Sequence, residues 1–411
     1  MQAAPHPYRW RIAILLGVGV LVNFFDRVNL SVSYDALTRQ FGLSTIAFGY
    51  LLSAYSWSYA ACQIPAGALL DRFGVKLVGR CSALLWSIAS FASALSPGIG
   101  QFFASRLLLG VGEAPIFPGN AKAVGNWFPE NERGLATACF DAAAKFASAI
   151  GVPIMGLLLF HFGWRWTFAA TGLASFLYFL GFTFIYREPD DGVAEVVQEK
   201  ISSQVSIEYL LTQRKVIGLA IGSAAYNYCF YLLLTWLPSY LALTLHLNLL
   251  QSTRYTAIPW LVATATDLII GGWLIDALIR RGFDASRVRQ SVLIGGTLLG
   301  VAIFAAGSAT TLPTALFWIT VSLGGLAAAA PVGWSIPSLI APRGGTGRVG
   351  GIMNFASQIA AISAPIITGY VVHITHSFKA AFWLAAIFLT IGIAAYAFLL
   401  GRIEHIESQN L

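Results

Sequence analysis

Twelve apolar segments, each about the length of a membrane-crossing helix, run through this chain of 411 residues. They cover 11–31, 46–69, 77–96, 101–122, 134–158, 166–186, 216–240, 254–279, 291–310, 313–338, 349–374 and 378–401. With 57% hydrophobic and only 10% charged residues, the composition is unlike that of a soluble domain. A helix needs about 20 apolar residues to cross ~30 Å of hydrocarbon. The pattern therefore predicts an all-α membrane protein with twelve transmembrane helices.

Basic residues predict the orientation of these helices. Most of the 25 Lys and Arg residues fall in loops on the side of the two termini. The opposite face receives Arg39, Arg165, Arg254 and Lys379. Cytoplasmic loops carry the excess of Lys and Arg, so both termini are expected in the cytoplasm. The same asymmetry accounts for most of the net charge of +7, and we expect no nucleic-acid partner.

One long polar segment divides the chain. It separates the sixth and seventh apolar segments and is rich in Asp and Glu. We predict an N-terminal six-helix half at 1–186, a cytoplasmic linker at 187–215 and a C-terminal six-helix half at 216–411. Two six-helix halves that rock around a site near the midplane are a known transporter architecture. Alternating access is the mechanism that this organisation predicts.

A weak internal repeat supports the division into halves. Gly67-x-x-x-Asp71 follows the second apolar segment, and Gly272-x-x-x-Asp276 follows the eighth. An Asp at a helix end, close to basic residues, can make charge-assisted contacts that hold one conformation. We therefore expect a cytoplasmic gate at the first of these sites.

Four charged residues lie deep in the apolar segments. Asp26 and Arg27 lie in the first segment, and Arg106 and Glu113 lie in the fourth. Ionised groups at membrane depth are costly, and those present usually bind ions or substrates along a water-filled path. The planar fork of an Arg suits bidentate binding of a carboxylate. These residues predict an anion transporter, in which an Arg that moves can change the proton affinity of a neighbouring acid. A purely structural cluster that locks the helices together is the alternative.

Four further charges lie within the segments: Lys122, Asp141, Lys145 and Asp267. Asp141 and Lys145 are four residues apart, so they can form a pair on one helix face. Lys145 can equally line an anion site, and the residue pattern leaves both hypotheses open. Because most of the embedded charges are in the first half, we expect proton and anion binding to concentrate there.

The sequence predicts neither a metal site nor an enzyme. The four cysteines, Cys62, Cys81, Cys139 and Cys229, form no C-x-x-C pair and no Cys/His cluster. No nucleophile–base set is visible either. We expect no cofactor apart from protons as the coupling ion.

Several sequence motifs resemble those of a known family. GALLDRFGVK, at 67–76, resembles the loop between the second and third helices of the major facilitator superfamily. A narrower resemblance, to the anion:cation symporter branch, covers nearly the whole chain. That branch includes bacterial importers of hexuronate, galactonate and glucarate, and relatives of sialin and the vesicular glutamate transporters. The matching runs are NFFDRVNLS, SAYSWSYAACQIPAGALLDRFG, SRLLLGVGEAPIFP, NWFPENERG and GGIMNFASQIAAISAPIITGY.

The resemblance implies a role for individual residues. Arg27 is expected to bind the substrate carboxylate, and Asp26 and Glu113 are the expected proton sites with Arg106 as their movable partner. Further substrate contacts are implied at Tyr59, Trp334 and Asn354, and Lys145 is a candidate from the pattern of charges. The gate motif comprises Gly67, Asp71, Arg72, Gly74 and Lys76.

Two positions depart from the family pattern. Phe24 stands where galactonate-type relatives can have a Tyr, and Ala144 stands where a polar contact can occur. They leave the identity of the acid open. The sequence thus predicts a proton-coupled symporter, functional as a monomer in a bacterial inner membrane, that imports a sugar-acid anion: an aldonate, aldarate or hexuronate. The alternatives are an importer of an aromatic or short-chain carboxylate, and a membrane sensor that does not transport.

Overall fold

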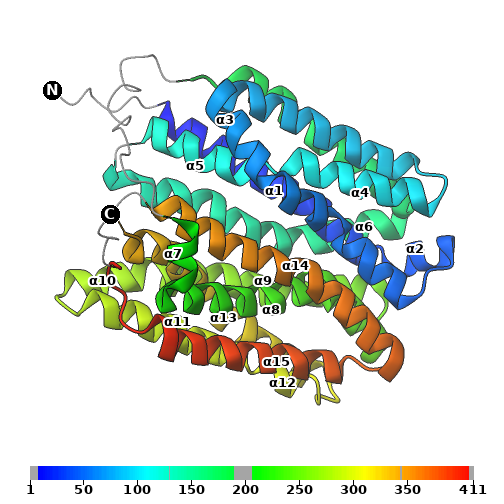
Figure 1. The fold of residues 1–411 in the computed structure, drawn as a ribbon. Helices are drawn as coiled ribbons and strands as arrows, with labels where there is room; N and C mark the ends of the chain where they lie inside the picture. The colour runs from blue at the N-terminus through cyan, green and yellow to red at the C-terminus, as the bar shows by residue number, and fades with distance from the viewer. Residues whose placement is uncertain (1–7, 129, 189–205, 343–344, 407–411) are drawn as a thin grey trace. The chain divides into compact units, whose positions relative to one another are not determined.

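The computed structural model describes residues 8–128, 130–188, 206–342 and 345–406, without the side chains of 71, 130–135, 138, 346 and 347. The chain divides into two compact units, Met1–Glu199 and Lys200–Leu411, and each is a bundle of long helices packed side by side (Figure 1). Most of the predicted linker lies outside the described residues. A short helix, α7 (Ile207–Thr212), begins just after they resume.

Two glycines reverse the chain direction inside the N-terminal unit. Gly74 has φ 75° and ψ 168°, and Gly163 has φ 77° and ψ 171°. Residues with a Cβ atom rarely adopt this positive-φ conformation, whereas glycine adopts it readily. Glycine therefore permits each turn between two predicted membrane spans. As a result, α3 and α6 each contain two predicted spans. The helices of this unit are α1 (Arg9–Val32), α2 (Tyr34–Phe41), α3 (Thr45–Leu95), α4 (Ile99–Glu113), α5 (Ile116–Trp127) and α6 (Glu130–Ile185).

The fourth predicted span, 101–122, is not one continuous helix. The structure ends α4 at Glu113 and begins α5 at Ile116, which corrects the sequence-based prediction. Pro118 has no N–H to donate to the carbonyl four residues earlier, at Ala114. That carbonyl instead accepts a hydrogen bond from Gln63 Nε2 at 3.5 Å. The break makes Glu113 the last residue of α4. Pro115 and Pro118 follow it in the sequence.

The described part of the C-terminal unit contains two π-helical stretches that the sequence did not predict, η2 (Asp267–Leu274) and η3 (Ala395–Leu400). The eighth span, 254–279, is built from α9, a π-helical stretch η2 that begins at Asp267, and α10. π-Helical turns are rare and occur frequently at functional sites. The ninth predicted span, 291–310, is divided between α11 and α12. The elements are α8 (Arg214–Thr244), α9 (Leu249–Thr266), η2 (Asp267–Leu274), α10 (Ile275–Arg280), α11 (Ala285–Gly300), α12 (Ile303–Ala306), α13 (Leu312–Ile340), α14 (Thr346–Thr375), α15 (Lys379–Ala394) and η3 (Ala395–Leu400).

Nine helical runs among the described residues are long and apolar enough to cross a membrane. One of them, Cys139–Ile185, holds two predicted spans on either side of Gly163. The two predicted spans outside the nine are 46–69, which forms the first part of α3, and 101–122, which is divided between α4 and α5. All twelve predicted spans therefore correspond to helical segments of the described structure.

The packing of four helices of the N-terminal unit positions its charged residues. Val22 of α1, Trp86 of α3 and Leu109 of α4 share one buried apolar cluster. The rings of Trp86 and Tyr178 of α6 are stacked, with centroids 5.3 Å apart and planes 6° apart. Large buried aromatic rings contribute strongly to packing. This cluster holds α1, α3, α4 and α6 together beside the acids and arginines described next.

Candidate substrate and proton site

Arg27 and Glu113 form a buried ion pair within the N-terminal unit. Arg27 Nε and Nη2 both donate to Glu113 Oε2, at 3.1 and 3.0 Å. The Arg27 side chain is 6% exposed and that of Glu113 is fully buried. Charge-assisted hydrogen bonds of this kind are about twice as strong as neutral ones. The pair therefore connects the C-terminal part of α1 to the end of α4.

Three aromatic rings surround the Arg27 guanidinium. Its central carbon lies 4.6 Å from the ring centroids of both Phe24 and Tyr55, and 5.5 Å from that of Tyr59. Cation–π contacts of this kind attract the guanidinium and keep it oriented. The resemblance implied Tyr59 as a substrate contact, but the sequence analysis predicted no contact of Phe24, Tyr55 or Tyr59 with Arg27. Their spacing offered a signal: Phe24 precedes Arg27 by one helical turn, and Tyr55 precedes Tyr59 by one turn.

Two glycines in α4 allow the close helix contacts that build this site. A Cβ at Gly110 would lie 2.1 Å from the backbone oxygen of Tyr55, and a Cβ at Gly112 would lie 2.8 Å from the backbone nitrogen of Trp86. Neither backbone can yield cheaply, so α4 can approach both parts of α3 only because these positions lack a side chain. The sequence GVGE thereby packs the end of α4, where Glu113 lies, closely against α3.

Asp26 faces a different environment from its neighbour Arg27, because successive side chains on a helix point about 100° apart. Its carboxylate accepts hydrogen bonds from Ser90 Oγ at 2.6 Å and from Ser175 Oγ at 3.0 Å. Asp26 is fully buried. The two predicted proton sites thus differ: Glu113 is bound to a guanidinium, and Asp26 is bound to hydroxyl groups.

Arg106 is buried beside Asp26, and within the described part of the chain it binds the Asp26 backbone and forms no ion pair with the Asp26 carboxylate. Its Nη1 donates to the backbone oxygen of Asp26 at 3.2 Å, and its Nη2 donates to Ser93 Oγ at 2.9 Å. The predicted ion-pair partner of Glu113 was Arg106, whereas the structure pairs Glu113 with Arg27. A role for Arg106 as a movable partner in another conformation stays a prediction.

Lys145 forms the pair that its spacing allows. Its Nζ lies 2.7 Å from Asp141 Oδ2, and its side chain is 6% exposed against 26% for that of Asp141. The i,i+4 hypothesis is therefore correct for this conformation. A pair that is partly exposed on one side can still be opened by an anion, so a substrate role for Lys145 stays a prediction.

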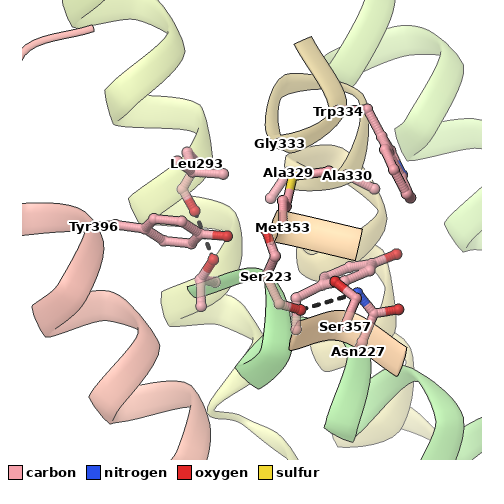
Figure 2. Close-up of a pocket in the computed structure, with 12 residues that line it drawn as sticks. Ser223, Asn227, Leu293, Ala329, Ala330, Gly333, Trp334, Met353, Ser357 and Tyr396 are labelled. Carbon is pink, nitrogen blue, oxygen red and sulfur yellow. Dashed lines mark hydrogen bonds between the residues drawn. The ribbon is translucent and has the colours of Figure 1, made fainter. Parts of the chain in front are cut away.

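The predicted contacts in the C-terminal unit lie near a pocket with a neutral lining (Figure 2). Trp334 lines it and is 52% exposed, and Asn354 is half-buried on the adjoining helix α14. Asn227, at the other side, donates to the Ser223 backbone oxygen at 2.9 Å. Ser357 lines the same pocket, 4% exposed. The lining residues are Ser223, Tyr226, Asn227, Leu293, Thr297, Ala329, Ala330, Gly333, Trp334, Met353, Ser357 and Tyr396.

The gate motif surrounds the turn at Gly74 in the N-terminal unit. Glu188, just after α6, accepts a hydrogen bond from the backbone N–H of Lys76 through Oε1 at 2.8 Å. A carboxylate at a helix N-terminus binds the free N–H groups there and is favoured by the helix dipole. Arg72 is exposed, and its guanidinium carbon lies 5.1 Å from the ring centroid of Phe73. Gly67 has open space around its Cα, and the side chain of Asp71 lies outside the described residues.

Comparison with known proteins gives consistent matches. The sequence model of the Major Facilitator Superfamily matches residues 16–283. An uncharacterized transporter, YybO, from Bacillus subtilis (strain 168) is 35% identical over 98% of this chain and 96% of its own. A probable galactarate/D-glucarate transporter, GudP, of the same organism is 32% identical over 97% and 93%. The inward-facing, unoccupied structure of a bacterial homolog of the human lysosomal transporter Spinster has a TM-score of 0.80 at 18% identity, covering 97% of this chain and 98% of its own.

Proposed function

Because the chain belongs to the major facilitator superfamily, in its anion:cation symporter branch, it is a membrane transporter and not an enzyme, and we propose that it imports a sugar-acid anion together with protons. One relative is described as a probable galactarate/D-glucarate transporter, which supports a sugar acid as cargo. We place the protein in the bacterial inner membrane as a monomer, with both termini in the cytoplasm on the evidence of the basic loops.

The observation that carries the proposal is the buried pair of Arg27 and Glu113. The guanidinium edge that binds Glu113 is the same edge that would bind a substrate carboxylate, with Nε and Nη2 as its donors. An anion therefore competes with Glu113 for Arg27. Protonation of Glu113 removes its charge and weakens its hold, so a proton and an anion enter together. The three aromatic rings limit the access of water to the exchange.

The C-terminal unit has a pocket of its own, whose lining suits a polyhydroxy compound. Its pocket is lined by hydroxyl and amide groups, including those of Asn227 and Ser357, and by Trp334. Such groups both donate and accept hydrogen bonds, as the hydroxyls of a sugar acid do. The described lining residues carry no charge. We propose that Arg27 of the N-terminal unit binds the substrate carboxylate, and that Trp334 and Asn354 of the C-terminal unit contact hydroxyl groups of a sugar acid.

Uptake into proteoliposomes tests the proposal. An imposed pH gradient, acidic outside, should drive accumulation of labelled D-galactonate, D-glucarate or D-glucuronate by the wild-type protein. Benzoate and lactate form the comparison arm for aromatic and short-chain carboxylates. Accumulation of these acids instead of any sugar acid would contradict the substrate class, and uptake indifferent to the pH gradient would contradict proton coupling.

A single substitution tests the anchor. Arg27→Lys keeps the charge but loses the planar fork, so uptake at subsaturating substrate should fall by about tenfold or more while the protein still inserts. The matched control is Arg39→Lys, at an exposed position of the same unit, which should transport normally. Normal uptake by Arg27→Lys would remove Arg27 from the anchor role.

A further inference from the structure

The acid Asp26 has hydrogen-bond partners of an unusual kind for a buried carboxylate. Both of its oxygens accept hydrogen bonds from serine hydroxyls, Ser90 on α3 and Ser175 on α6. The nearby guanidinium of Arg106 binds the backbone oxygen of Asp26. A guanidinium or an N–H can only donate, so it cannot accept the hydrogen of a protonated acid. A hydroxyl both donates and accepts, so it can fit either protonation state.

Ser175 has a second partner within reach. Its Oγ lies 3.0 Å from Asp26 Oδ2 and 2.9 Å from the backbone oxygen of Thr171. A serine hydroxyl carries one hydrogen, so it can donate to only one of these acceptors at a time. When Asp26 is ionised, the hydrogen points to Asp26. When Asp26 is protonated, its own O–H can donate to Ser175 Oγ, and the serine hydrogen then turns to the Thr171 oxygen.

We propose that Ser175 is a positioning residue for the proton site, which lets Asp26 gain and lose a proton in place. Rotation of one hydroxyl keeps every polar atom bonded in both states, which avoids the cost of a buried group without a partner. This inference rests on the proposed proton coupling. It also separates the two acids, because Glu113 is bound to the donor-only Arg27 and cannot be protonated without loosening that pair.

The surroundings of Asp26 are compatible with this role. The helices packed around it present neutral hydroxyls from α3 and α6, namely those of Ser90, Ser175 and Thr171. The charged groups that act on it are Arg106 and Glu113, both from α4. The hydroxyls are the groups around Asp26 that can both donate and accept.

The test compares Ser175→Ala with Ser175→Thr in pH-gradient-driven uptake. Loss of the hydroxyl removes a charge-assisted bond from the ionised acid and a weaker neutral bond from the protonated acid, so the ionised state loses more. The pH midpoint of uptake should therefore move up by about one unit, a tenfold change in proton affinity. The threonine variant keeps a hydroxyl and should restore the wild-type profile.

A double-mutant cycle distinguishes this role from that of a simple donor. Asp26→Asn imitates the protonated acid, and its amide N–H can donate to Ser175. If Ser175 serves both states, Ser175→Ala should lower the thermal stability in the Asp26→Asn background as well as in the wild type. A loss confined to the wild-type background, or an unchanged pH profile in Ser175→Ala, would overturn the inference.

Failure of the inference can be distinguished from failure of the variant to fold and from failure of proton coupling. If Ser175→Ala does not fold, infrared spectra of the wild type at low pH provide the test. The carboxyl band that Asp26→Asn removes should have the frequency of a hydrogen-bonded acid. A free-acid frequency would refute the inference. If wild-type uptake ignores the pH gradient, proton coupling fails and the role of Ser175 fails with it. If uptake follows the gradient but the Ser175 variants do not differ from wild type, only the inference fails.

Discussion

The proposed competition between Glu113 and the substrate for Arg27 predicts that removing the charge of Glu113 strengthens substrate binding. Replacing Glu113 with Gln keeps the shape of the side chain but removes its charge, as protonation would. Arg27 then has a weak amide acceptor in place of a carboxylate. The variant should bind a sugar-acid anion more tightly than the wild type at neutral pH, even though a residue of the binding site has been changed.

The size of the effect follows from the two bonds that the substrate must replace. Arg27 Nε and Nη2 bind the same oxygen of Glu113, at 3.1 and 3.0 Å, so we count them as one charge-assisted interaction. Such an interaction is worth about 1.5–3 kcal/mol. Its release corresponds to an affinity gain of roughly 10- to 100-fold. The gain should be largest at high pH, where the wild-type Glu113 is ionised, and should disappear at low pH.

Titration calorimetry with D-galactonate at several pH values measures this directly. Wild-type affinity should rise as pH falls, and that of Glu113→Gln should be high and independent of pH. In proteoliposomes the variant should retain substrate exchange between preloaded vesicles and lose accumulation driven by a pH gradient. The matched control is Asp35→Asn, the same chemical change at an exposed residue of this unit, which should behave as wild type. Equal or weaker binding by Glu113→Gln, or retained accumulation, would refute the competition.

Three further predictions concern charge and packing. Import of a monoanion with more than one proton should be accelerated by an inside-negative potential, worth ~2.3 kcal/mol per charge per 100 mV, and uptake indifferent to an imposed potential would argue against two protons. A double-mutant cycle on substrate binding tests whether Lys145 only pairs with Asp141; if so, the double variant Asp141→Asn, Lys145→Met should keep the wild-type substrate affinity. Loss of affinity in every variant that carries Lys145→Met would assign Lys145 to the anion site. Gly110→Ala should destabilise the protein by about 1–3 kcal/mol or more in thermal unfolding, because its Cβ would lie 2.1 Å from the backbone oxygen of Tyr55. Gly181→Ala is the control, since a Cβ there would meet nothing within 4 Å. Equal stability of the two variants would contradict the packing argument.

The sequence alone predicted the membrane spans and the presence of charged residues buried within them. Both follow from local chemistry: a span needs a certain apolar length, and an ionised group at membrane depth is costly wherever the rest of the chain lies. The pair of Asp141 and Lys145 was also predictable, since residues four apart on one helix are neighbours. The break after Glu113 was missed, although Pro115 and Pro118 were visible.

The partners across helices were decided only by the tertiary structure. Glu113 could in principle pair with Arg106 or Arg27, and the choice depends on how α1 and α4 pack within the unit, where Gly110 and Gly112 hold α4 close to α3. Ser175 is 149 residues from Asp26 in sequence, so no local pattern joins them. Spacing determines which residues share a face of one helix, whereas packing determines which faces meet.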